Sequence, residues 1–410
     1  LVPCSLARVR RGPRVGLLYD AAATPEFALA IMAAFGRDAN FSTRDGGRIN
    51  FEVTARFADA VAELGDASSG ENVPRRFSAE QSNTSIAFGE KMVLKLYRRL
   101  QPGIHPEIEV GRFLTEVANY ANTPPLFGVV EHIGKDGTPT ALAVLQGFVP
   151  NQGDAWTQLL EALKRELETY ALIPVDEAQP VSDAFAPYLR YAAILGKRTA
   201  EMHRAFATPT DDAAFAIEPM TQADVDAAVG DARAQADKAF AALEGLPEST
   251  HTADSKRLLE LKDSCYAAID RLNAAPVGAM KTRIHGDYHL GQVLISHDDV
   301  FIVDFEGEPS RPADERRGKF SPLRDVAGML RSFAYAAETA SRDVGRHLPD
   351  AAARATAAGE DFRRQISGAF LDGYEETLEG SEVRIEDRAT YDNLLKLHLL
   401  GKALYEVVYE

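Results

Sequence analysis

The residues best suited to catalysis lie close together near residue 290. Asp287 stands in the segment His-Gly-Asp-Tyr-His, Gln292 follows five residues later, and Asp304 follows the next apolar run. A carboxylate can orient a hydroxyl and take its proton, and further oxygen ligands can hold Mg²⁺ beside it. Phosphoryl transfer to a hydroxyl requires both. We therefore predict Asp287 as the catalytic base and Gln292 and Asp304 as metal ligands; a solvated turn with an acidic strand end is the alternative.

Two apolar runs predict how these residues are held. Val293–Ile295 and Val300–Val303 flank a short polar turn, a pattern typical of a β-hairpin. Further along, Asp325 begins a predicted helix. We expect structural roles for Asp325 and His285, with Asp325 bracing the backbone of the loop that carries Asp287.

Lys95 is the second candidate for chemistry. It stands in Val93–Tyr97, a predicted strand whose other residues are apolar. In kinases, a helix glutamate can hold such a lysine over nucleotide phosphates. Both Glu107 and Glu109 follow on a predicted helix, and the apolar residues around Glu109 favour it as the partner. The alternative is a lysine that faces solvent on an edge strand.

Two further segments are weaker candidates for nucleotide contacts. The first has small polar residues whose hydroxyls and backbone amides can fold over phosphates, although it lacks a glycine-rich pattern and a plain hairpin turn explains it equally well. The second ends a predicted strand, where backbone groups could meet an adenine edge. The predicted contacts are Ser82, Asn83, Thr84, Ser85, Gln146 and Phe148.

The last predicted helix carries a polar face. Lys402, Tyr405, Glu406 and Tyr409 are spaced at i, i+3, i+4 and i+7, so they lie on one side of a helix. Two tyrosines among charged groups can bind sugar hydroxyls and stack on a sugar ring. A solvated helix face is the alternative.

Composition restricts the class of protein. The chain has 410 residues, 45% of them hydrophobic, and a net charge of −16, which disfavours a nucleic-acid partner or an anionic membrane surface. Its two cysteines form no disulfide framework, so we expect a reducing, cytoplasmic location. No long apolar run or signal-peptide pattern is seen. The start at Leu1 and the end inside a predicted helix suggest a piece of a longer chain.

The order of predicted elements gives an α+β fold. Residues 76–150 read strand, strand, helix, strand, strand, which is the order of a small nucleotide-binding lobe. Residues 1–75 are expected to form an N-terminal α+β cap. Residues 151–410 are expected to form a mostly helical lobe that contains the catalytic hairpin.

The motifs together resemble a known group of enzymes. Lys95 with Glu109, the segment His285–Gln292 and the segment Asp304–Glu306 resemble protein-kinase-like small-molecule kinases, such as aminoglycoside phosphotransferases. The longer string from Asp304 to Ala337 looks like that of bacterial maltokinases. Leu195–His203 and the Lys402–Glu406 helix fit the same family.

That resemblance implies a bilobal kinase-like fold and transfer of phosphate from ATP, with Mg²⁺, to the anomeric hydroxyl of maltose. The product would be maltose 1-phosphate for α-glucan synthesis. It also implies a trehalose synthase domain, in cis or as a partner. The sugar site would include His289, Glu306 and Glu308 beside the terminal helix.

Two alternatives remain open at this point. One is a kinase for another small molecule, such as glucosamine or an aminoglycoside. The other is a catalytically inactive scaffold for a trehalose-isomerising partner, which the intact set of Lys95, Asp287, Gln292 and Asp304 argues against.

Overall fold

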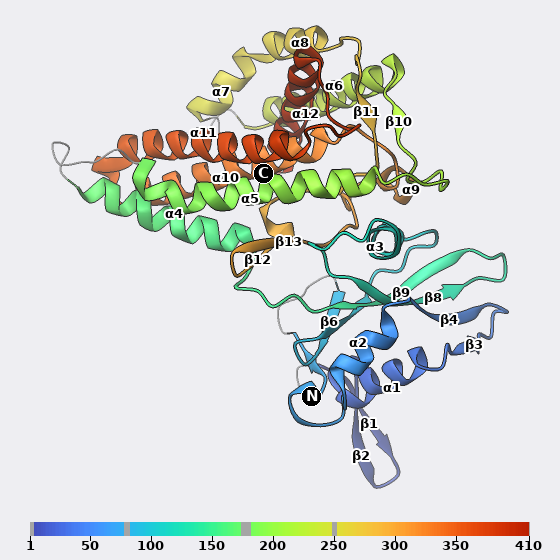
Figure 1. Cartoon of the computed structure of the whole chain (residues 1–410). Helices are drawn as coiled ribbons and strands as arrows, with labels where there is room; N and C mark the ends of the chain where they lie inside the picture. The colour runs from blue at the N-terminus through green and yellow to red at the C-terminus, as the bar shows by residue number, and fades with distance from the viewer. Residues whose placement is uncertain (1–3, 78–82, 174–181, 248–251, 410) are drawn as a thin grey trace. The chain divides into compact units, whose positions relative to one another are not determined.

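The computed structural model describes residues 4–77, 83–173, 182–247 and 252–409. The chain forms two compact units, one made of Leu1–Pro150 with Arg311–Ala313 and the other of the remaining residues. Figure 1 shows that the first unit is rich in strands and the second is mostly helical. The fold is therefore α+β, and the chain divides after Pro150, where the helical part was expected to begin.

An antiparallel sheet of seven strands forms the centre of the first unit, in the order β3-β4-β8-β9-β7-β6-β5. The strands are β3 (Asn40–Ser42), β4 (Arg48–Val53), β5 (Arg75–Arg76), β6 (Asn83–Phe88), β7 (Met92–Tyr97), β8 (Leu126–Ile133) and β9 (Pro139–Gly147). Strands β3 and β4 come from the expected cap, but β4 pairs directly with β8. Residues 40–53 therefore extend the same sheet, because the alternating apolar residues of β4 bury one face against a helix.

Helices cover both faces of this sheet. On one face, α1 (Pro25–Phe35) and α2 (Phe57–Leu64) contribute to a core in which the rings of Phe35 and Phe51 meet edge to face at 5.3 Å. Burial of one such ring stabilises the fold by about 2 kcal/mol. On the other face, α3 (Pro106–Arg112) continues into a short π-helical turn and packs against Tyr97 and its neighbours. Because side chains alternate along β7, Lys95 lies on the face that α3 covers.

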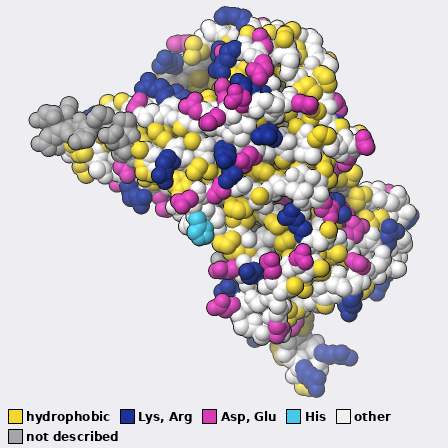
Figure 2. All heavy atoms as spheres, viewed as in Figure 1, with side chains coloured by type: hydrophobic (Ala, Val, Ile, Leu, Met, Phe, Trp, Pro, Cys, Tyr) yellow, Lys and Arg dark blue, Asp and Glu magenta, His cyan; other side chains and the backbone are white. Residues whose placement is uncertain are grey.

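A hairpin precedes the sheet. Strands β1 (Ser5–Arg11) and β2 (Arg14–Tyr19) pair only with each other in the described part of the chain, and all their side chains are exposed. Figure 2 shows basic side chains gathered at its tip. Asp20 joins the base of the hairpin to the sheet through ion pairs with Arg76 and Arg98.

The second unit is built mainly from helices, with one small hairpin and one short pairing of two distant strands. Its helices are α4 (Ala155–Leu172), α5 (Ser182–Phe206), α6 (Gln222–Glu244), α7 (Ala253–Glu260), α8 (Lys262–Arg271), α9 (Ala313–Arg316), α10 (Leu323–His347), α11 (Ala352–Thr377) and α12 (Arg388–Tyr409). Its strands are β10 (Glu218–Pro219), β11 (Met280–Lys281), β12 (Val293–Ser296) and β13 (Asp299–Ile302). Helices α5, α11 and α10 lie side by side (Figure 1).

Local sequence explains several of these boundaries. Asp154 caps α4 by accepting the Thr157 N–H, as its position predicted. Thr221 and Asp224 form a capping box at the start of α6. Two helices, α7 and α8, follow each other directly, because the backbone of Leu261 leaves helical geometry and separates them.

The β-hairpin expected after Gln292 is confirmed in its strand pairing. Val293 pairs with Ile302, and Ser296 pairs with Asp299 across a two-residue turn. His297 has a φ of 55° in this turn, the left-handed conformation that two-residue hairpin turns need. No helix in the described part of the chain combines the length and apolar character needed to cross a membrane.

Candidate active site

A buried carboxylate holds the loop that carries Asp287. The Oδ2 atom of Asp325 accepts the backbone N–H of His285 at 2.8 Å, and its Oδ1 atom accepts that of Gly286 at 3.0 Å. Asp325 is only 2% exposed. Burial opposes its ionisation, but the hydrogen bond and electrostatic attraction of His203, with those of His285 and the backbone of Gly286, lower the pKa of Asp325 overall. The two residues before Asp287 are thus fixed by an anionic brace.

His285 ties the same loop to the far end of the hairpin. Its Nε2 atom lies 3.0 Å from the carbonyl oxygen of Val303, and its ring packs 4.8 Å from that of Phe305. Those two residues flank Asp304. The predicted base and the predicted metal ligand are therefore held in one hydrogen-bonded frame.

The predicted metal ligands lie next to each other. The Nε2 atom of Gln292 donates to Oδ2 of Asp304 at 3.2 Å. Asp304 has a φ of 68°, a left-handed conformation that costs a residue with a side chain about 1 kcal/mol or more. Such strain is typical of functional sites. The amide and carboxylate oxygens of this pair are the ligand type that Mg²⁺ prefers, so the residues present fit that ion.

Helix α10 approaches the loop closely because Gly328 has no side chain. A Cβ atom there would lie 2.5 Å from the carbonyl oxygen of Tyr288, the residue after Asp287. The Tyr288 hydroxyl in turn lies 2.8 Å from the Thr199 hydroxyl, in the interior. The loop is thus held by its packing against α10 as well as by hydrogen bonds.

Three of the predicted sugar-site residues form a series of contacts that begins at Asp287. Lys402 Nζ lies 3.8 Å from Oδ1 of Asp287 and 4.9 Å from the centre of the Tyr405 ring. Burial, then the charge and hydrogen bond of Glu308, raise the pKa of Tyr405. Glu308 also accepts the Ser310 hydroxyl at 2.9 Å. Lys402 therefore lies against the predicted base, and Tyr405 and Glu308 follow it in turn.

The other predicted sugar contacts have partners within the protein. Glu406 is bound by Arg331 of α10, at 2.6 and 3.0 Å, so its carboxylate joins α12 to α10. His289 accepts the Gly291 N–H at 3.1 Å, and burial lowers the pKa of its ring. The carbonyl oxygen of Glu306 accepts a hydrogen bond from Arg316 at 2.9 Å. The side chain of Tyr409 lies outside the described residues.

Lys95 of the first unit has a different partner from the expected one. Its Nζ atom lies 3.1 and 2.9 Å from the two carboxylate oxygens of Glu107, which also accepts the Tyr97 hydroxyl. The choice of Glu109 as the ion-pair partner was therefore wrong. Glu107 lies in the first turn of α3 and is buried, whereas Glu109 is half-buried. Helix α3 therefore directs a different face toward the sheet from the one that its apolar residues predicted.

The two weaker segments also differ from the expectation. Asn83, Thr84 and Ser85 belong to strand β6, where the Thr84 and Ser85 side chains are buried and Thr84 accepts a hydrogen bond from Arg98 at 2.9 Å. They do not form a loop, and Ser82 lies outside the described residues.

At the end of β9, the backbone is already engaged. The Phe148 N–H donates to Lys91, and the N–H that follows Gln146 donates to Pro125, both at 2.9 Å. These two N–H groups are therefore satisfied within the sheet and cannot serve an adenine edge as expected.

A carboxylate on a braced loop, an adjacent Gln–Asp pair and a Lys–Glu pair are groups that a protein-kinase-like phosphotransferase requires. The chain belongs to the phosphotransferase enzyme family APH, whose sequence profile matches residues 73–364.

Two relatives to which the chain is similar are glucosamine kinases. The chain is 28% identical over 309 residues to a glucosamine kinase of Streptacidiphilus jiangxiensis, covering 74% of this chain and 62% of that relative. It is 26% identical over 337 residues to a glucosamine kinase of Mycolicibacterium smegmatis, covering 82% and 74%. The chain thus spans less than two thirds of the first relative's length.

Solved structures share the fold. A glucosamine kinase structure, crystal form B, matches with a TM-score of 0.68 and 24% identity, over 98% of this chain and 82% of that one. Another, in complex with glucosamine, ADP and inorganic phosphate, matches with a TM-score of 0.66. At this identity the likeness establishes the fold alone.

Sequence reasoning missed two residues that shape the site and preferred the wrong one of two glutamates. A glycine inside a predicted helix, here Gly328, is a recognisable signal of close packing. His203 lies among apolar residues of its helix, which was a signal for a buried polar contact. The selection of Glu107 had no such local signal.

Proposed function

We propose that this protein is a kinase that transfers the γ-phosphate of ATP to a hydroxyl of an aminosugar of the glucosamine type. One arrangement carries the proposal: Asp287 stands on a rigidly held loop with Lys402 against it, and Tyr405 and Glu308 follow in turn. The similarity to two glucosamine kinases supports an aminosugar over maltose as the acceptor.

In the proposed reaction, Asp287 accepts the proton of the acceptor hydroxyl while the hydroxyl oxygen forms its bond to the γ-phosphorus. The bond to the β-phosphate oxygen breaks, and ADP leaves with that electron pair. The Asp325 brace keeps Asp287 in place, which reduces the entropy cost of aligning the hydroxyl. Lys402 orients the carboxylate from the other side.

The negatively charged phosphates of ATP need positive charge beside them. Lys95, held by Glu107, is suited to contact the phosphates of ATP. Gln292 and Asp304 would hold Mg²⁺, which supplies neutralisation of phosphate charge when bound.

The charges around the base favour an aminosugar. Glucosamine carries an ammonium group near neutral pH, and Glu308 offers a carboxylate for it. Lys402, 3.8 Å from Asp287, repels the ammonium from the base. The ring would therefore be oriented with its amino group toward Glu308 and a hydroxyl toward Asp287.

Maltose is the second candidate. The string from Asp304 to Ala337 and the segment Lys402–Glu406 resemble those of maltokinases. A neutral disaccharide would use Glu308 as a hydrogen-bond acceptor for hydroxyl groups, and Tyr405 as a stacking surface.

A coupled assay of ADP release, with glucosamine, N-acetylglucosamine, glucose, maltose and an aminoglycoside as acceptors, separates these possibilities. We expect the highest kcat/KM with glucosamine and little with its N-acetyl form, which lacks the ammonium. A higher kcat/KM with maltose would instead support the maltokinase reading. No turnover with any acceptor would overturn the kinase proposal.

A variant tests the ammonium contact directly. Glu308→Gln should raise KM for glucosamine about tenfold, the usual loss for a hydrogen bond to a charged group, with a smaller effect on glucose. Glu338→Gln, an exposed carboxylate on α10, is the control for loss of one charge. An equal effect of Glu308→Gln on both sugars would contradict the ammonium assignment.

A further inference from the structure

Three buried polar side chains from three helices form a chain of hydrogen bonds that ends at the catalytic loop. The Tyr374 hydroxyl of α11 lies 2.9 Å from Nδ1 of His203 on α5. The Nε2 atom of His203 lies 3.1 Å from Oδ2 of Asp325 on α10. That carboxylate accepts the two backbone N–H groups that precede Asp287. Tyr374 and His203 are 1% and 0% exposed, so water does not compete within this chain.

We propose that Tyr374 is a positioning residue for Asp287, acting through His203 and Asp325. The inference rests on the proposed phosphotransfer function, because the effect is on the placement of the base. Tyr374 touches neither the loop nor the predicted sugar-site residues in any hydrogen bond of the described chain. Its influence would pass through the imidazole alone.

The donors and acceptors of this chain define how the imidazole is held. Asp325 can only accept when ionised, so the Nε2 atom of His203 donates its N–H to it. Where Nδ1 carries the lone pair of that tautomer, the Tyr374 hydroxyl is the donor that satisfies it. Without that donor, Nδ1 is left unsatisfied in the interior, and the ring loses the contact that keeps its Nε2–H aimed at the carboxylate. Tyr374 therefore fixes the ring orientation that the brace requires.

Close helix packing sets the distance between tyrosine and imidazole. A Cβ atom on Gly373, next to Tyr374, would lie 2.3 Å from the carbonyl oxygen of Ala193 on α5. The two helices can meet this closely only because that position lacks a side chain. The Tyr374 ring also meets the His203 ring edge to face at 5.6 Å. The hydroxyl has little freedom to choose another partner.

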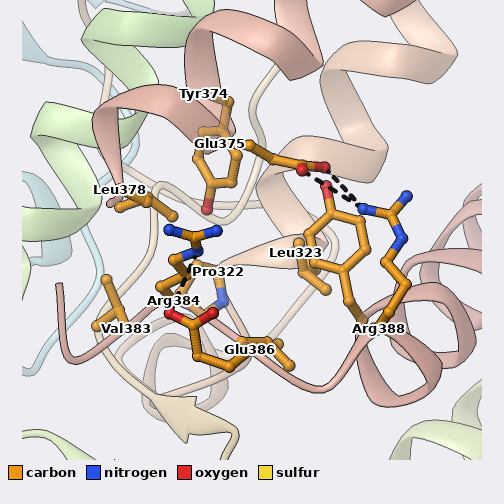
Figure 3. Close-up of a pocket in the computed structure, with 11 residues that line it drawn as sticks. Pro322, Leu323, Tyr374, Glu375, Leu378, Val383, Arg384, Glu386 and Arg388 are labelled. Carbon is orange, nitrogen blue, oxygen red and sulfur yellow. Dashed lines mark hydrogen bonds and ion pairs between the residues drawn. The ribbon is translucent and has the colours of Figure 1, made fainter. Parts of the chain in front are cut away.

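A neighbouring tyrosine supplies a matched control. Tyr374 and Tyr391 both line a cavity of about 90 Å³ at the end of α11 (Figure 3). Tyr391 is also buried, and Glu375 and Arg388 lie beside it. No hydrogen bond in the described chain links Tyr391 to His203. The two residues differ in their connection to the catalytic loop more than in their burial.

The test compares Tyr374→Phe with Tyr391→Phe in the full-length protein, with kcat and KM measured for both substrates. We expect Tyr374→Phe to lower kcat about tenfold, as the loss of an outer hydrogen bond that orients a functional group does, with both KM values unchanged. Tyr391→Phe should keep the wild-type kcat. Equal thermal stability of the two variants would show that unfolding is not the cause.

A double-mutant cycle tests the route. In a His203→Gln background, where the side-chain amide can still donate to Asp325, Tyr374→Phe should have no further effect on kcat. Equal losses in both backgrounds, or a wild-type kcat for Tyr374→Phe, would overturn the inference while the kinase proposal stands. If no sugar is phosphorylated, the same comparison is made on ATP hydrolysis with water as the acceptor. Failure of the kinase proposal is thereby separated from failure of this one.

Discussion

Two hydrogen-bonded side-chain pairs hold functional groups in this protein, one in each unit. They differ in how deeply they are buried. Lys95 and Glu107 of the sheet unit keep 12% and 9% of their side-chain surface exposed. His203 and Asp325 of the helical unit keep 0% and 1%. The first pair has a tyrosine hydroxyl as an additional partner, whereas Asp325 also accepts two backbone N–H groups.

The difference indicates distinct tasks. A lysine that binds phosphates must stay accessible, so its ion pair cannot be sealed in the interior. A brace for a catalytic loop gains from complete burial, because an unpaired charge there is very costly and only one geometry satisfies all partners. Disruption of the first pair should change nucleotide affinity. Disruption of the second should change the fold and the chemical step together.

The largest effect is expected at Asp287, whose loop is held by the more deeply buried pair, His203 and Asp325. Asp287→Asn should lower kcat by about a thousandfold, because general-base catalysis is lost. ATP affinity should be largely unchanged, as measured by calorimetry. A turnover close to wild type in this variant would remove Asp287 from the base role.

The next largest effect is expected at Asp325, the residue that braces the loop. Asp325→Ala should lower the free energy of unfolding by about 3 kcal/mol or more, because His203 and two N–H groups lose a buried partner. Urea denaturation measures the change. Glu107→Ala is the counterpart in the sheet unit, with an expected loss of about 1 kcal/mol. Equal losses would show that the two pairs do not differ as their burial indicates.

The packing beneath the loop is tested at Gly328. Gly328→Ala should lower kcat by up to about a hundredfold, because the new methyl group displaces Tyr288 and with it Asp287. Gly230→Ala, on α6 where nothing lies within 4 Å of the new atom, is the matched control and should be neutral. If both variants turn over normally, the close approach does not position the loop.

Substitutions at Glu107 and Glu109 test which glutamate is the functional partner of Lys95, the observed one or the expected one. Glu107→Gln should raise KM for ATP about tenfold, because Lys95 loses a charged partner in a partly buried site. Glu109→Gln is predicted to change it much less. The reverse order of effects would restore Glu109 as the functional partner.

The smallest effect concerns His398, a half-buried histidine whose ring has no carboxylate bonded to its Nε2 atom in the described part of the chain. The Nε2 atom of His398 is buried with no hydrogen-bond partner among the described residues. Burial, then the charge of Arg324, lower its pKa to about 3, while Asp325 opposes the shift. Since the unfolded histidine has a pKa near 6.5, the unfolded state takes up the proton first as the pH falls. Stability is therefore full above about pH 6.5 and declines below it.

From pH 7 to pH 6 this one residue should cost about 0.7 kcal/mol of unfolding free energy. In His398→Asn that part of the pH dependence should vanish, as urea titrations at both pH values would show. His347→Asn, an exposed histidine, should leave the pH dependence unchanged. A pH dependence that is equal in wild type and His398→Asn would contradict the burial argument.

Much of the fold could be predicted because its signals are local. The β12–β13 hairpin and the cap of α4 follow from apolar periodicity, turn residues and capping chemistry. The join between β4 and β8 could not be predicted in this way. Any strand with one apolar face can extend a sheet, and nothing local to residues 48–53 specifies the partner.

The same division holds in the site. The sequence by itself indicated phosphotransfer chemistry, because Gln292 and Asp304 flank one hairpin whose local folding brings them together, and Asp287 precedes it by a few residues. Only the tertiary structure decided which glutamate holds Lys95, since both lie on one short helix and its rotation is set by packing. It also decided the link between His203 and Tyr374, which are 171 residues apart. Contacts at that separation depend on how whole helices pack, and no spacing along the chain encodes them.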